Sequence, residues 1–109
     1  MLASAAFLGP DQHYLILTRS LHTTEQDRVL GQDQIHLELD DQIHSSYGGV
    51  AFGSLRPGCL ELALNNRGSG NIGTTMIVVS FSISADRFAH LCDVTKLLFD
   101  GHSFFTVVY

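Results

Sequence analysis

The strongest constraint on the fold is a strict alternation of apolar and polar residues between positions 33 and 39. Ile35, Leu37 and Leu39 fall on one side of this segment, and the residues between them are polar. Period-two alternation over this length is typical of a β-strand with one face in the core. Similar patterns or β-rich composition predict further strands at residues 13–21, 42–47, 50–55, 60–64 and 74–83, and residues 104–109 are expected to form a final strand or a clip over the core.

Asp40 and Asp41 end the alternating strand and turn the chain back on itself. A three-residue loop from Asp40 to Gln42 pairs Leu39 with Ile43 and keeps both on the apolar face. A shift of one residue would place Ile43 among polar side chains, because successive side chains of a strand point to opposite faces. We therefore expect the three-residue loop.

One segment near the C-terminus has helical spacing. Ser84 is a residue type that caps helix N-termini, and Gly101 suits the position just after a helix. The apolar stripe between them follows the i, i+3, i+4 rule: Phe88, Leu91, Cys92, Thr95, Leu98 and Phe99. The sequence therefore predicts a single α+β domain over residues 1–109. Its expected form is an antiparallel β-meander of about six strands with one amphipathic C-terminal helix packed on the sheet.

Residues 65–73 and 74–83 follow one another but differ in composition, and we expect different structures for them. Residues 65–73 are rich in Gly and Asn and contain Gly-x-Gly-x-x-Gly, but they precede a strand and so lack the context of a phosphate-binding motif. We expect a long loop there. Residues 74–83 are β-branched and nearly all apolar, which is typical of a central strand covered on both faces.

The charge of the chain is acidic and unevenly distributed. Six Lys and Arg residues face eleven Asp and Glu residues, giving a net charge of −5, all of it within the first 41 residues. This balance argues against a nucleic-acid-binding protein, which needs a basic face, and favours a basic protein partner. No apolar stretch is long enough for a membrane span, and residues 1–8 lack the basic flank of a signal peptide. We therefore expect a cytoplasmic protein with no membrane partner.

Histidine and cysteine side chains can bind a metal ion or take part in catalysis, and the chain has six histidines and two cysteines. In the expected register His36, Glu38 and His44 share one sheet face, a residue set that can hold zinc or iron. We interpret these three as solvent-facing polar residues and keep a small metal-dependent enzyme as an alternative. Cys59 and Cys92 match no zinc or redox spacing and are interpreted as small buried apolar residues. The sequence thus predicts a binding module that is not an enzyme and has no cofactor.

The stretch Tyr14–Leu64 carries four segments with a recognisable pattern: YLILTRS, QIHLELDDQ, SSYGGV and LRPGCLELAL. In these segments the chain resembles immunity protein family 10 of bacterial polymorphic toxin systems. The resemblance implies a small cytoplasmic bacterial protein that binds and neutralises a toxin made by the same or a neighbouring cell.

Under this resemblance, the partner-binding residues are expected in the acidic part of the chain. Glu38, Asp40 and Asp41 would complement a basic toxin surface, and Tyr47 would serve as an aromatic anchor. A third possibility is a self-associating structural module, in which an exposed sheet edge pairs with a second copy to give a homodimer.

Overall fold

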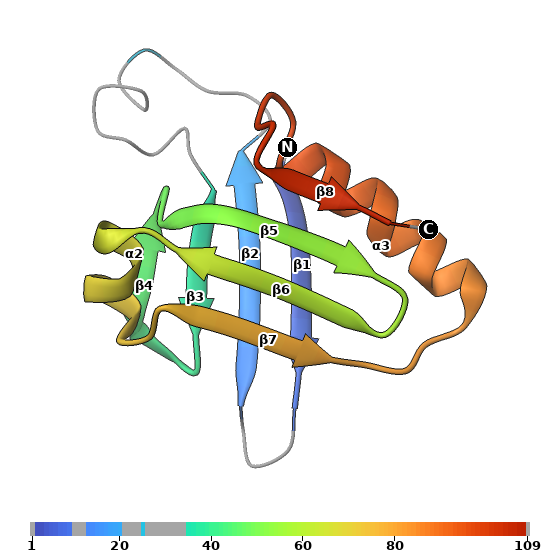
Figure 1. Cartoon of the computed structure of the whole chain (residues 1–109), viewed down its shortest axis with the longest axis horizontal. Helices are drawn as coiled ribbons and strands as arrows, with labels where there is room; N and C mark the ends of the chain where they lie inside the picture. The colour runs from blue at the N-terminus through green and yellow to red at the C-terminus, as the bar shows by residue number, and fades with distance from the viewer. Residues whose placement is uncertain (1, 10–12, 21–24, 26–34, 109) are drawn as a thin grey trace.

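The chain forms two four-stranded β-sheets and two helices in the part that the structure describes (Figure 1). A computed structural model describes residues 2–9, 13–20, 25 and 35–108. The first sheet is antiparallel and contains, in spatial order, β1 (Leu2–Leu8), β2 (Tyr14–Ser20), β3 (His36–Leu39) and β4 (Asp41–Tyr47). The second sheet contains, in spatial order, β7 (Met76–Ser80), β6 (Cys59–Leu64), β5 (Val50–Arg56) and β8 (Phe105–Val107). The helices are α2 (Asn66–Ile72) and α3 (Ala85–Leu98).

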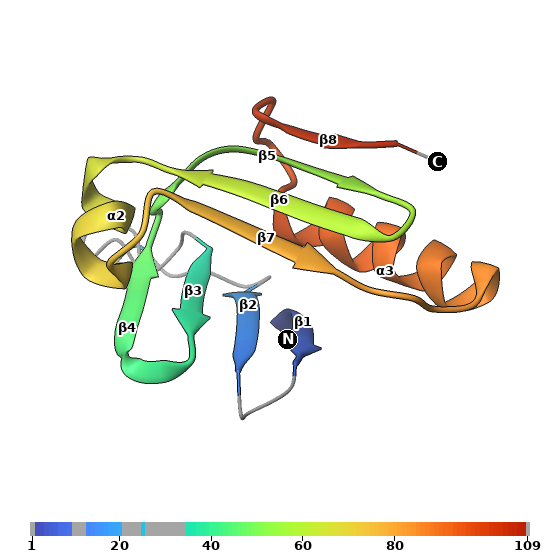
Figure 2. The same ribbon diagram turned by 60° about the horizontal axis from the view of Figure 1, so that its bottom comes forward.

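The two sheets enclose one hydrophobic core. The strands of the second sheet cross over those of the first, and α3 lies beside the second sheet and packs against β1 and β2 (Figures 1 and 2). The fully buried leucines come from both sheets and from α3: Leu15, Leu17, Leu37, Leu55, Leu60, Leu62 and Leu98. This arrangement confirms the expected α+β class and the packed C-terminal helix. The strands outnumber the prediction because residues 2–8 form β1, and β8 departs from the antiparallel meander by pairing in parallel with β5.

The helix α3 has the start that its sequence predicts. The Ser84 side chain accepts a hydrogen bond from the Arg87 backbone N–H at 3.3 Å, and Cys92, Thr95 and Leu98 form the buried stripe. At the other end, Arg19 from β2 donates from Nη1 to three backbone carbonyl oxygens, those of Leu97 at 3.5 Å, Leu98 at 3.2 Å and Asp100 at 2.7 Å. A cation at this position satisfies carbonyls that the helix leaves unpaired. No helix in the described ranges is both long and apolar enough to cross a membrane.

The segment expected as a loop at residues 65–73 is the helix α2. The Asn65 side chain caps it by accepting from the Gly68 backbone N–H at 2.9 Å. Gly68 lies directly against Gly49, and a Cβ on Gly68 would lie 2.2 Å from the Gly49 carbonyl oxygen. The loop prediction was wrong because glycine disfavours helices in isolation, whereas here a glycine is needed for the two backbones to approach.

The pairing of β3 with β4 differs by one residue from the expected register. Leu37 pairs with Ser46 and Glu38 with Ser45, and the ladder is irregular between Glu38 and Leu39. Ile43 is therefore 77% exposed, and Ser46 takes the inner position. Because α2 packs against β4 and its Asn71 side chain donates to Ser46 Oγ at 3.1 Å, a small polar residue is favoured at this inner position.

The strand β7 lies at the edge of the second sheet, so the expectation of a central strand at residues 74–83 was wrong. Its outer side chains Met76 and Val78 are 45% and 58% exposed. Only its inner side chains, such as Ile77, are buried. An apolar composition did not distinguish a strand covered on both faces from an edge strand.

Candidate functional site

The three predicted acidic residues lie together at the β3–β4 turn. Glu38 is on β3, Asp40 is the turn residue and Asp41 begins β4. Asp40 has a backbone φ of 63°, a left-handed conformation that Asp tolerates better than most residues. Asp40 and Asp41 are exposed, and Glu38 is half-buried. The turn is thus open to solvent, as a binding surface requires.

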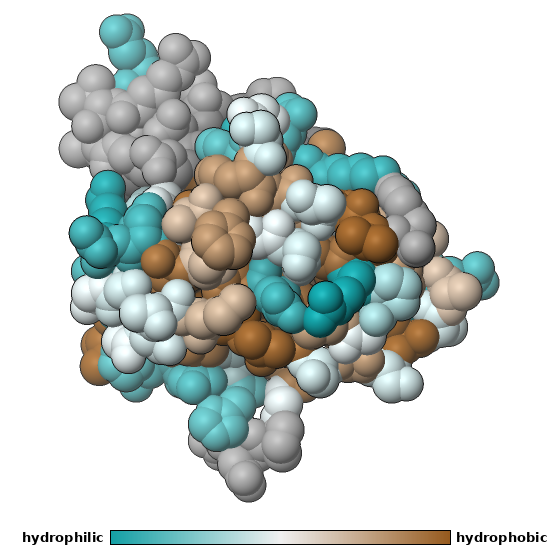
Figure 3. Space-filling view, viewed as in Figure 1, coloured by the Kyte–Doolittle hydropathy of each residue, from teal (hydrophilic) through white to brown (hydrophobic). Residues whose placement is uncertain are grey.

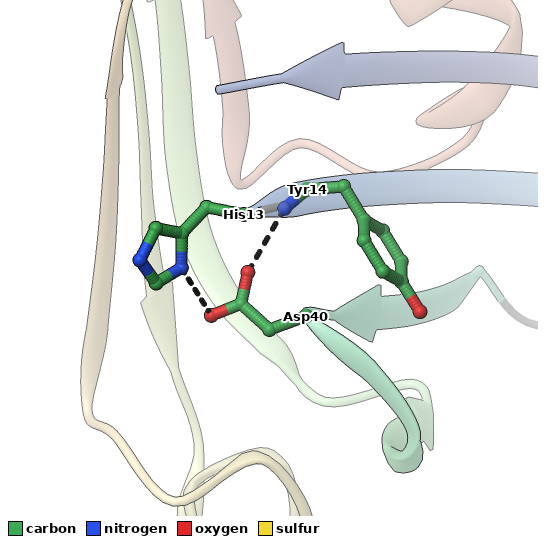
Figure 4. Close-up of polar contacts among 3 residues, drawn as sticks. All are labelled: His13, Tyr14 and Asp40. Atoms are coloured by element: carbon green, nitrogen blue, oxygen red, sulfur yellow. Dashed lines mark hydrogen bonds and ion pairs between the residues drawn. The ribbon is translucent and has the colours of Figure 1, made fainter. Parts of the chain in front are cut away.

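Asp40 connects this turn to the start of β2 (Figure 4). Its carboxylate accepts from the Tyr14 backbone N–H at 2.9 Å and lies 3.1 Å from His13 Nδ1, while its own backbone N–H donates to the Tyr14 carbonyl oxygen at 2.9 Å. The hydrogen bond from the Tyr14 N–H, with the neighbouring His13 and the charge of His44, holds the pKa of Asp40 below its usual value. Asp40 therefore stays ionised and fixed in orientation.

Glu38 is held by a second contact from the same strand. The Tyr14 hydroxyl donates to Glu38 Oε2 at 2.7 Å. This hydrogen bond, with burial and the nearby negative charges of Glu38, Asp41 and Asp40, raises the pKa of Tyr14 to about 12. The tyrosine consequently remains a hydrogen-bond donor throughout the physiological range.

Asp41 has the fewest constraints of the three acids. Its Oδ1 accepts from the Ile43 backbone N–H at 3.3 Å, which is a local turn contact. Among the acidic residues of the first 41 positions, Asp11, Asp27 and Asp33 lie outside the described residues.

Tyr47 lies on the outer face of the first sheet, which is the face turned away from the second sheet. Alternation places Glu38, His36 and Tyr47 on this face, because their neighbours Leu37 and Ser46 point inward. The Tyr47 ring packs against the ring of His36 at a centroid distance of 4.7 Å. The aromatic pair and Glu38 therefore share the outer face of the β3–β4 hairpin.

The alternative metal site is not assembled in this geometry. Glu38 pairs with Ser45 and His36 with Tyr47, whereas His44 falls in the irregular stretch next to the turn. Across the described residues, no group of three or more His, Cys, Asp or Glu side chains is arranged to hold a metal ion. The expected register, from which this alternative was derived, is the register that the structure corrects.

Sequence reasoning missed His13 and Tyr14 as parts of the site. They lie 24 to 27 positions before the acids that they contact. A signal was available, since the pairing of β2 with β3 brings Tyr14 opposite the end of β3 once both segments are recognised as neighbouring strands. The sequence shows each strand separately but not which strands pair.

Comparison with known proteins identifies a family. The family model described as Immunity protein 10 matches residues 1–89, which contain the whole first sheet and every residue of the candidate surface. Neither the curated proteins nor the solved structures gave a match. The match covers well over half of the 109 residues and includes the Tyr14–Leu64 stretch on which the resemblance was based. The chain therefore belongs to the Immunity protein 10 family, a family of immunity proteins that act against toxins.

Proposed function

We propose that this protein neutralises a cognate polymorphic toxin by binding it through the acidic end of the β3–β4 hairpin. The observation that carries the proposal is the clustering of Glu38, Asp40 and Asp41 within four positions at a solvent-exposed turn. Membership of the Immunity protein 10 family supplies the class of partner. The toxin surface that fits this turn is basic.

The geometry favours binding because the acids are held in place before a partner arrives. Tyr14 and His13 fix the carboxylates of Glu38 and Asp40, so little side-chain freedom remains to be lost on association. Tyr47 lies on the same outer face as Glu38 and offers an aromatic surface of the kind that often anchors interfaces. Charge steers the encounter, and the aromatic contact adds affinity.

Neutralisation by this route needs no chemistry from the immunity protein. A stable complex buries on the order of 1,600 Å² in total, which is enough to cover a small active site or block a substrate path. We infer that the protein acts in the bacterial cytoplasm, where a toxin from the same or a neighbouring cell reaches its target.

The test uses the toxin encoded by the gene adjacent to the immunity gene. Asp41→Lys reverses a charge whose side chain bonds locally to the Ile43 N–H, and it should lower the association rate constant about tenfold at low salt. The loss should shrink at high salt, because ions screen the steering field. Association rates are measured by biolayer interferometry, and protection is measured by growth of cells that express the toxin.

The matched control is Asp93→Lys, which makes the same charge change at an exposed position of α3, on the other side of the molecule from the hairpin (Figure 1). This variant should keep the wild-type association rate to within about twofold. Equal losses in both variants would show that the association rate constant depends on the net charge of the protein and not on where the charge lies. The hairpin would then not be the binding surface.

A further inference from the structure

Within the described residues, β7 is an outer strand of the second sheet, and no strand pairs with its other side. In the antiparallel ladder with β6, the Leu64 N–H donates to the Thr75 carbonyl and the Phe81 N–H donates to the Gly58 carbonyl. Hydrogen-bonded pairs alternate along such a ladder, so the backbone groups of Ile77 and Val79 face β6. Those of Val78 and Ser80 face away, and within residues 2–9, 13–20, 25 and 35–108 no hydrogen bond reaches them.

A groove runs along this free edge. One hollow of about 270 Å³ lies between β7 and the chain ends of the first sheet, with His13, Tyr14 and Asp40 in its wall. A second hollow of about 760 Å³ continues it towards α3. The two hollows share four lining residues, which makes them parts of one groove: Phe7, Leu8, Val79 and Ser80.

The groove has an apolar wall and an acidic end. Apolar side chains of β1 and β7 line both hollows of the groove. On the outer face of β7 the side chains of Met76 and Val78 are exposed, and apolar side chains show over this strand in the space-filling view (Figure 3). Residues 76–80 contain no charged residue and no proline, the two features that commonly protect exposed edges from pairing. Asp40 lies at the end of the groove nearest the β3–β4 turn.

We propose that an extended segment of the toxin adds as a strand to the free edge of β7, with a lysine or arginine of that segment lying over Asp40. Backbone pairing satisfies the outward groups of Val78 and Ser80, and alternate apolar side chains of the segment cover Met76 and Val78. This inference rests on the proposed function and extends the acidic turn into a groove with a defined occupant.

A second copy of this chain fits the groove less well than a basic segment. Each copy has a net charge of −5, so two copies repel one another as a whole. Like charges disfavour that pairing, whereas a basic segment is attracted to the same place.

Hydrogen exchange of the wild-type protein with the adjacent-gene toxin tests the pairing directly. The amides of Val78 and Ser80 should exchange about tenfold more slowly in the complex, because they gain hydrogen bonds to the added strand. The amides of Ile77 and Val79 are the internal control, since they are already bonded to β6 in the free protein. Unchanged exchange at Val78 and Ser80 in a formed complex overturns the inference while leaving the acidic turn as the binding surface.

Two variants at one position separate the backbone from the side chain. Val78→Pro removes the outward N–H without removing a bond to β6, and it should weaken toxin binding about tenfold. Val78→Ala keeps the N–H and should stay within about threefold of the wild type. Circular dichroism checks that each variant is folded. If Val78→Pro does not fold, the hydrogen-exchange measurement on the wild-type complex decides the question.

The remaining outcomes also decide between hypotheses. If the wild-type protein forms no complex with the toxin, both this inference and the proposed function are wrong. If light scattering shows a dimer without toxin and the same two amides are protected in it, a second copy is the occupant and the toxin-strand inference is overturned.

Discussion

Asp40 shows how one residue determines the shape of the candidate surface. It was singled out from the sequence as a turn acid and a partner-binding candidate, and the structure shows that its side chain and backbone both bond to Tyr14. The turn itself was predictable, because paired aspartates between two alternating segments are a strong local signal. The contact with Tyr14 was not, because it joins residues 26 positions apart.

The pKa of Asp40 leads to a pH-dependent prediction. Its pKa in the folded protein is below the usual 3.8, so its contribution to stability is present above that pH and is lost as the pH falls through the folded value. Asp40→Asn removes the charge but tolerates the positive φ. It should lower the free energy of unfolding by about 0.5 kcal/mol at neutral pH, a small value because the side chain is 38% exposed and solvent screens it.

Urea unfolding at several pH values measures this difference. The gap between wild type and Asp40→Asn should narrow as the pH falls below about 3.8 and through the lower pKa of folded Asp40, because the aspartate takes up a proton there and becomes uncharged like the asparagine. The same measurement on Asp41→Asn compares Asp40 with a carboxylate that accepts a local turn hydrogen bond from the Ile43 N–H. A gap that stays constant with pH would contradict the prediction.

Among the elements, α2 and β4 form a unit that packs backbone against backbone. Gly68 of α2 lies on Gly49, which directly precedes β5, and Asn71 reaches Ser46 of β4. This close packing explains the small inner residue of β4 and thus the exposure of Ile43. The unit could not be predicted from apolar periodicity, because glycine, serine and asparagine form its contacts.

Two glycines of α2 give opposite expectations for the same substitution. A Cβ at position 68 would lie 2.2 Å from the Gly49 carbonyl oxygen, so Gly68→Ala should destabilise the protein by about 2 kcal/mol or more. A Cβ at position 70 meets no atom within 4 Å, so Gly70→Ala should stabilise the helix by about 0.5 to 1 kcal/mol. Thermal unfolding measures the change in stability of each variant. A loss of stability in Gly70→Ala would show that Gly70 does not lie at an open position of a helix.

Strands and the long helix were more predictable than their arrangement. The alternation that produces β3 and β6, and the capped stripe that produces α3, are local properties of the sequence. An alternating strand indicates that one face is buried, but it does not specify which element buries it. For that reason the division of the strands into two crossing sheets, with β7 at an edge, was not predicted from the sequence.

At the scale of the whole molecule, Arg19 joins the first sheet to the end of α3. Its guanidinium donates to carbonyl oxygens 78 to 81 positions further along the chain. The contact links β2 to a helix that lies beside the second sheet (Figure 2). It therefore fixes the C-terminal end of α3, which packs against β1 and β2, on the first sheet.

Replacing this arginine should weaken the whole fold. Arg19→Met keeps much of the side-chain volume but removes three hydrogen bonds to helix-end carbonyls, and it should lower the free energy of unfolding by about 1 to 2 kcal/mol. Arg56→Met is the control, because Arg56 is exposed and forms a surface ion pair with Glu61 at 2.8 Å, so its replacement should cost less than about 0.5 kcal/mol. Chemical denaturation measures both variants, and equal effects would mean that Arg19 acts as an ordinary surface charge.

The parallel pairing of β8 with β5 has a consequence for the order of folding. Gly53 pairs with Phe105, so 52 positions must be brought into a closed loop before this contact forms. The pairs within the first sheet and between β5, β6 and β7 span far shorter separations and cost less chain entropy to form. We therefore expect the hairpin that carries the acidic turn to form before β8 docks on β5.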